Sequence, residues 1–124
     1  MGDARATILI CEDEPSLREL VKASLEGGYE FVEAEDGVRS LELARELEPD
    51  LLVLDVMMPR LDGLAVLREL RADERLANLR VIVLTAQPMT RQDAIDLGAD
   101  RVLDKPFAPD ELAAAVKEVL AEER

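Results

Sequence analysis

Short apolar runs alternate with longer amphipathic stretches along the chain. The apolar runs indicate five strands, at residues 7–11, 30–34, 51–56, 80–85 and 101–103. The amphipathic stretches repeat leucine, valine and alanine at helical spacing and indicate a helix after each strand, the last two at residues 90–97 and 109–121. Strands that alternate with helices predict an α/β fold, a doubly wound parallel sheet covered by helices on both faces.

Residues that favour helix ends mark several boundaries. Ser16 and Glu19 match a capping box at the start of the first helix, and Gly27-Gly28 is expected to end it. Asp36-Gly37 is expected to begin the second helix. The connections are short and no linker interrupts the pattern. We therefore expect one domain over residues 1–124, with a structured core at 7–121.

The composition narrows the compartment and the partners. The chain has 15 Lys and Arg against 28 Asp and Glu, a net charge of −13, which disfavours direct nucleic-acid binding and favours cations or a basic partner surface. The single cysteine forms no internal disulfide, and no apolar run is long enough for a signal peptide or a membrane span. A cytoplasmic protein without membrane contact is expected.

Polar residues stand where the predicted strands end. Glu12 and Asp13 follow the first strand, Asp55 ends the third, Thr85 ends the fourth and Lys105 follows the fifth. Each could be an ordinary cap or surface charge. However, the carboxyl ends of parallel strands meet at one edge of a sheet, where ligands of such folds bind. The joint occurrence therefore predicts a functional site at that edge.

The chemistry of that set is specific. Three carboxylates held close repel one another unless one takes up a proton or a cation compensates them. Acidic oxygens suit a hard cation such as Mg²⁺, whereas the absence of histidine disfavours zinc. A carboxylate beside Mg²⁺ and a lysine is a plausible nucleophile toward phosphorus.

At this point the chain resembles the receiver domain of two-component response regulators, over residues 7–121. The resemblance rests on five short motifs in order and spacing, which are Glu12-Asp13, Asp55-Val56-Met57-Met58-Pro59 with Asp62-Gly63, Thr85-Ala86, Gly98-Ala99-Asp100 and Lys105-Pro106-Phe107. It implies a flavodoxin-like strand order 2-1-3-4-5 in three α/β/α layers. It also implies a signalling protein of a phosphorelay rather than an enzyme.

The resemblance assigns a role to each site residue. Asp55 would accept a phosphoryl group from a histidine kinase or a His-phosphotransfer protein. Asp13 would bind Mg²⁺ (or Mn²⁺), with Glu12 reaching the ion directly or through water. Asp55 itself and the backbone carbonyl of Met57 would complete the protein ligands.

The resemblance also assigns the residues around the phosphoryl group. Lys105 would contact it, and Thr85 would hydrogen-bond one of its oxygens. The Lys105–Pro106 peptide is expected to be cis, and Pro59, Asp62 and Gly63 are expected to shape the loop and start the third helix.

Two positions depart from the family pattern. Val102 stands where many members carry an aromatic residue coupled to movement of the threonine, so we expect activation through backbone displacement of the face formed by the fourth helix, fifth strand and fifth helix. Met57 and Gln87 resemble positions that flank the path of an attacking water. Met57 cannot orient water, so slow self-hydrolysis is expected.

Other functions fit less well. A haloacid-dehalogenase-type phosphatase needs a second aspartate at the position of Met57, and a flavin carrier needs a phosphate loop where Glu12 and Asp13 stand. No P-loop or G-x-G-x-x-G pattern occurs. A non-phosphorylated pseudo-receiver, acting as an interaction module, stays open as an alternative. We expect a monomer or a phosphorylation-dependent homodimer, without an output domain in this chain.

Overall fold

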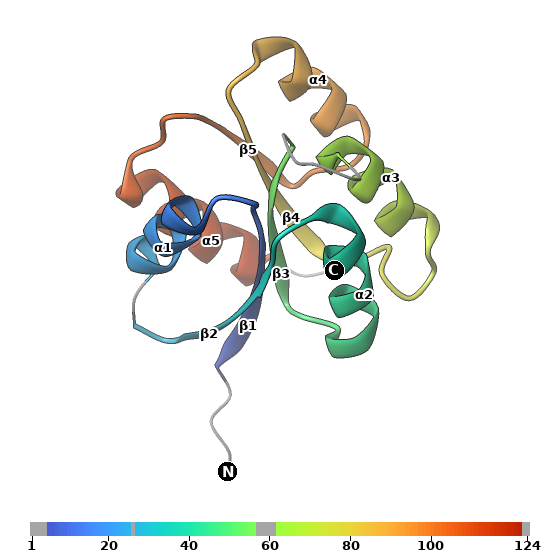
Figure 1. The fold of residues 1–124 in the computed structure, drawn as a ribbon, viewed down its shortest axis with the longest axis horizontal. Coiled ribbons are helices and arrows are strands. Elements are labelled where there is room, and N and C mark those ends of the chain that lie inside the picture. Colours follow the sequence, from blue (N-terminus) through green and yellow to red (C-terminus); the bar gives the residue numbers. More distant parts are fainter. Residues whose placement is uncertain (1–4, 26, 57–61, 123–124) are drawn as a thin grey trace.

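The computed structural model describes residues 5–25, 27–56 and 62–122. Within them, five strands form one parallel sheet in the order β2-β1-β3-β4-β5 (Figure 1). The strands are β1 (Ala6–Cys11), β2 (Tyr29–Ala34), β3 (Leu51–Asp55), β4 (Arg80–Thr85) and β5 (Arg101–Asp104). The expected strand order is confirmed.

Helices cover both faces of the sheet. They are α1 (Pro15–Ser24), α2 (Gly37–Leu47), α3 (Gly63–Ala72), α4 (Pro88–Asp96) and α5 (Pro109–Ala121). Figure 1 shows α1 and α5 on one side of the sheet and α2 and α3 on the other, with α4 following α3 along that side. The three-layer α/β/α architecture is therefore confirmed.

The central position of β3 explains why its residues before Asp55 are all apolar. All five of its residues are buried. Leu52 and Leu54 pack in the cluster under α2 and α3, while Leu51 and Val53 pack in the cluster under α1 and α5. A strand covered on both faces needs apolar side chains at every position, because successive residues point to opposite sides.

One expected helix cap and one expected helix start are wrong. The capping box at Ser16 does not form, because Glu14 is the N-cap of α1 and Pro15 takes the first helical position. The helix expected from residue 90 begins at Pro88, again with proline in the first turn. The start of α2 is confirmed, since the side chain of Asp36 accepts a hydrogen bond of 2.9 Å from the amide of Arg39.

The topology produces the site. β1 and β3 are neighbours in the sheet, but α1 follows β1 on one face and α3 follows β3 on the other. The chain thus departs in opposite directions from the carboxyl ends of these two strands, which leaves an open crevice between them. The residues after β1 and at the end of β3 lie at that crevice.

The start of α3 is held tightly against the end of β3. The Asp62 side chain accepts a hydrogen bond of 3.0 Å from the amide of Ala65, and the Gly63 amide donates to the Val56 carbonyl at 3.2 Å. A Cβ on Gly63 would lie 2.5 Å from the Val56 Cα and 2.7 Å from the Asp55 carbonyl oxygen. Only glycine permits this approach, which supports the structural role expected for Asp62 and Gly63. Pro59 lies outside the described residues.

Candidate functional site

Three acidic side chains meet at the crevice between β1 and β3. Glu12 and Asp13 follow β1 and Asp55 ends β3, and one carboxylate oxygen from each lies within 4.8 Å of the others. The structure therefore brings together the three carboxylates that the sequence placed at the strand ends. At this spacing three ionised groups repel one another strongly.

One lysine offsets part of this charge. Lys105 Nζ donates to Asp55 Oδ2 at 2.9 Å, and Asp55 is only 2 % exposed. The pair joins the end of β3 to the residue after β5, fifty positions further along the chain. Removing Lys105 would leave a buried carboxylate without this cation, which is costly. The peptide that follows, Lys105–Pro106, is cis as expected.

The surroundings of Glu12 disfavour the ionised form of its carboxyl group. It is 2 % exposed, and its Oε2 accepts a hydrogen bond of 3.0 Å from the Glu14 amide. Its Oε1 is buried and accepts no hydrogen bond from the described residues. Burial, together with the neighbouring Asp55 carboxyl, raises the pKa of Glu12 to about 9. The protein alone thus supplies too little positive charge here to keep all three groups ionised.

The cluster fits a hard divalent cation. Glu12 offers a buried oxygen that accepts no hydrogen bond from the described part of the chain. The exposed Asp13 leaves the site open to an ion that keeps several waters, as Mg²⁺ does. The ligand atoms are all carboxylate oxygens, the class that Mg²⁺ and Mn²⁺ prefer. Met57, whose backbone carbonyl was expected as a further ligand, lies outside the described residues.

The hydroxyl of Thr85 is engaged by the turn that follows β4. Thr85 is fully buried, and its Oγ1 accepts a hydrogen bond of 3.0 Å from the Gln87 amide and lies 3.4 Å from the Gln87 carbonyl oxygen. Any new hydrogen bond from this hydroxyl would therefore compete with the turn that leads into α4.

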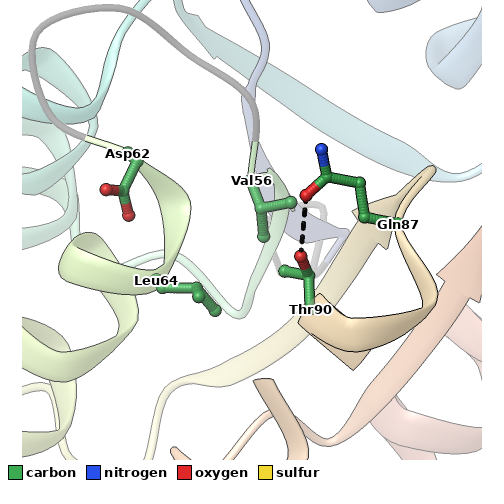
Figure 2. A pocket seen from close by; sticks show the side chains of 5 residues that line it. All are labelled: Val56, Asp62, Leu64, Gln87 and Thr90. Atoms are coloured by element: carbon green, nitrogen blue, oxygen red, sulfur yellow. Dashed lines mark hydrogen bonds between the residues drawn. The ribbon is translucent and has the colours of Figure 1, made fainter. Parts of the chain in front are cut away.

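A pocket of about 210 Å³ opens beside the start of α3 and the start of α4. Figure 2 shows its wall, formed by Val56, Asp62, Leu64, Gln87 and Thr90. The Thr90 hydroxyl donates to Gln87 Oε1 at 3.1 Å, which ties the Gln87 carboxamide to the first turn of α4. The sequence singled out Gln87, but it carried no sign that Thr90 holds its side chain.

An arginine of α4 links this helix to β5, and nothing in the sequence indicated this contact. Arg91 Nη1 donates to the Val102 carbonyl at 3.1 Å and lies 3.4 Å from Asp104 Oδ1. Val102 itself is buried among aliphatic side chains. At the position where many family members carry an aromatic ring, this chain thus has a small apolar side chain and an arginine that joins α4 to β5.

Among the described residues, no helix is both long enough and apolar enough to span a bilayer.

Comparison with known proteins gives one consistent result. The family model described as the response regulator receiver domain matches residues 8–117. The chain is 43 % identical over 116 residues to the DNA-binding dual master transcriptional regulator RpaA of Synechocystis sp., and 46 % identical over 116 residues to the response regulator MprA of Mycobacterium leprae. In both cases the match covers 91 % of this chain and about half of the relative, 48 % and 50 %.

Solved structures agree with the sequence comparisons. A response regulator from Chloroflexus aurantiacus superposes with a TM-score of 0.91 at 33 % identity, covering 95 % of this chain and 99 % of that one. The chemotaxis protein CheY4 of Vibrio cholerae superposes with a TM-score of 0.85 at 30 % identity, covering 94 % and 99 %. These proteins share the arrangement of strands and helices over almost the whole chain.

The raised pKa of Glu12 predicts a pH dependence of stability without divalent ions. In the unfolded chain Glu12 loses its proton near the ordinary pKa of 4.5, whereas in the folded protein it keeps the proton up to about pH 9. Between these values the folded state binds more protons than the unfolded state, so the free energy of unfolding should fall as the pH rises. Urea titrations in EDTA at several pH values would measure this slope. Glu12→Gln should flatten it, and an equal slope in wild type and variant would contradict the assignment.

Proposed function

Because the chain belongs to the receiver domains of response regulators, we propose that Asp55 is the residue on which it accepts a phosphoryl group. Phosphorylation on an aspartate is the general function of this family. The observation that carries the assignment is the environment of Asp55. It is the buried carboxylate of the cluster that also forms an ion pair with a lysine, at the end of the central strand.

Magnesium is the proposed cofactor, with Mn²⁺ as a substitute. Asp13, Glu12 and Asp55 would hold the ion, and the Met57 carbonyl is proposed as a further ligand. When bound, the ion supplies positive charge that compensates both the carboxylates and the phosphoryl oxygens. The unpartnered oxygen of Glu12 supports this proposal, because an ion between the carboxylates would satisfy it.

The proposed reaction is an in-line phosphoryl transfer from a phosphohistidine. A carboxylate oxygen of Asp55 forms the new O–P bond while the P–N bond to the donor imidazole breaks, and that electron pair stays on the imidazole nitrogen. Lys105, already at 2.9 Å from Asp55, would turn its ammonium to a phosphoryl oxygen. Thr85 would donate its hydroxyl to another phosphoryl oxygen.

The contacts of Thr85 suggest how phosphorylation would be transmitted. If Thr85 donates its hydroxyl to a phosphoryl oxygen, it gives up its contact with the Gln87 carbonyl oxygen. Because the Gln87 amide donates to the same hydroxyl oxygen, movement of Thr85 would also shift the turn into α4. Arg91 would pass this shift to β5 through the Val102 carbonyl. We therefore propose backbone displacement of α4, β5 and α5, without rotation of an aromatic ring.

The partners follow from the chemistry and the family. A histidine kinase or a His-phosphotransfer protein would supply the phosphoryl group, in the cytoplasm, and residues 1–124 would act as one receiver domain.

The chain spans about half the length of the curated relatives it matches. One of those relatives is a DNA-binding regulator. For this chain, we propose signalling to an output domain or to a separate protein. It would act as a monomer or as a phosphorylation-dependent homodimer. We propose no contact of this domain with nucleic acid or with a membrane. A scaffold that is never phosphorylated would need none of these site contacts.

We predict that the chain takes up one phosphoryl group from acetyl phosphate in the presence of Mg²⁺ and that Asp55→Asn does not. The amide cannot act as the nucleophile but keeps the size of the side chain. Intact-protein mass spectrometry would detect the added phosphoryl mass. Asp93→Asn, at an exposed aspartate on α4, is the matched control and should be labelled like wild type.

Two results would count against this function. Equal labelling of Asp55→Asn and wild type would exclude Asp55 as the acceptor. Repeated release of phosphate from an ester, without a stable phosphoprotein, would instead favour a phosphatase.

We also predict a long-lived phosphoprotein whose half-life is shortened several-fold by Met57→Asn. Methionine offers no hydrogen bond to an attacking water, whereas asparagine both donates and accepts. The measurement is the decay of the phosphoprotein after removal of acetyl phosphate. Met89→Asn, which makes the same change at a methionine that is 85 % exposed on α4, should leave the half-life unchanged. An unchanged or longer half-life in Met57→Asn would overturn the prediction.

A further inference from the structure

Arg18 of α1 reaches back to the loop that carries Glu12 and Asp13. Its Nη1 donates to the backbone carbonyl of Glu12 at 2.7 Å, and its Nε donates to Glu33 Oε1 on β2 at 2.8 Å. The side chain is only 18 % exposed, which is low for a surface arginine. One guanidinium therefore bridges the acidic loop and the neighbouring strand.

The carbonyl that Arg18 holds belongs to the peptide between the two acidic residues. A peptide unit is planar, so fixing this carbonyl also fixes the direction of the Asp13 amide. The preceding part of the loop is fixed as well, because the Glu12 amide donates to the Ala34 carbonyl at 3.0 Å and Glu12 Oε2 accepts from Glu14. Asp13 is exposed. Its position therefore depends on the backbone that Arg18 holds.

Lys22, a second cation on α1, also pairs with the carboxylate of Glu33. Lys22 Nζ lies 2.9 Å from Glu33 Oε2 and 2.8 Å from Glu19 Oε2. Lys22 and Arg18 together hold the pKa of Glu33 below its ordinary value, Lys22 being the larger influence. Glu33 thus stays ionised and fixes the Arg18 guanidinium, which is a rigid planar fork with several donors.

We propose that Arg18 is a positioning residue for the cation site, one that presets Asp13 and Glu12 by holding the peptide between them. This inference rests on the proposed Mg²⁺-dependent function. Residues that orient the ligands of a metal usually matter for affinity almost as much as the ligands themselves. Glu33 acts one step further away, by fixing Arg18.

Charge alone predicts the opposite effect of removing Arg18. A guanidinium near the site repels a divalent cation, so its loss should tighten Mg²⁺ binding if only electrostatics mattered. If Arg18 acts by holding the peptide, its loss should weaken binding. The sign of the change therefore separates the two explanations.

The test is calorimetric titration of the full chain with Mg²⁺, comparing wild type, Arg18→Met and Lys22→Met. Both variants remove one positive charge from α1 and one partner of Glu33, but only Arg18→Met removes the contact to the Glu12 carbonyl. We expect the dissociation constant of Arg18→Met to rise about tenfold or more. That of Lys22→Met should stay within about twofold, because Arg18 still pairs with Glu33 Oε1 and still donates to the Glu12 carbonyl without Lys22.

A second measurement separates positioning from general damage. For Arg18→Met, acetyl phosphate labelling should need more Mg²⁺ but approach the wild-type rate at saturation. Arg18→Lys keeps the charge but offers one ammonium to two acceptors, Glu33 and the Glu12 carbonyl. Its affinity for Mg²⁺ should therefore lie between those of wild type and Arg18→Met. It serves as the test if Arg18→Met does not fold.

The outcomes distinguish this inference from the proposed function. Equal Mg²⁺ affinity in Arg18→Met and Lys22→Met, or tighter binding in Arg18→Met, would overturn the role of Arg18. Wild-type affinity in Arg18→Lys where Arg18→Met does not fold would also overturn it. A wild-type chain that neither binds Mg²⁺ nor takes up a phosphoryl group would overturn the proposed function itself.

Discussion

The structure depends on three carboxylates held within 4.8 Å of one another at the end of a buried strand. One lysine at 2.9 Å from Asp55 offsets only part of this negative charge. Burial and the neighbouring Asp55 raise the pKa of Glu12, and its buried Oε1 accepts no hydrogen bond from the described residues. A divalent ion and a phosphoryl group bound as proposed would compensate this arrangement.

The fold is what makes this crowding tolerable. β3 is anchored by apolar side chains on both faces, and Gly63 lets α3 start directly against its end. Apolar packing of β3 and the close approach of Gly63 thereby fix the position of Asp55 independently of its charge. The contacts of Thr85 with the Gln87 backbone then connect the same edge to α4, the helix that Arg91 ties to β5. The acidic cluster and the proposed responsive face of α4, β5 and α5 are thus linked by direct contacts.

Much of the fold and of the site was predictable from the sequence. Both depend on the spacing of apolar residues and on the order of strands and helices along the chain. The apolar run ending in Asp55 indicates a central strand, and alternating strands and helices fix where strand ends meet. What could not be predicted are contacts across the chain that involve ordinary surface residue types. Arg18 resembles any solvated arginine on a helix until its distance to the Glu12 carbonyl is known. The capping-box prediction at Ser16 failed since Pro15 competes for the first turn.

The acidic cluster is proposed to hold a divalent cation. The most direct measurement is anomalous diffraction from crystals of the chain grown with Mn²⁺, which locates the ion without reference to activity. One strong peak is expected among the carboxylates of Glu12, Asp13 and Asp55. No peak there at saturating Mn²⁺, or an ion bound only elsewhere on the surface, would contradict it.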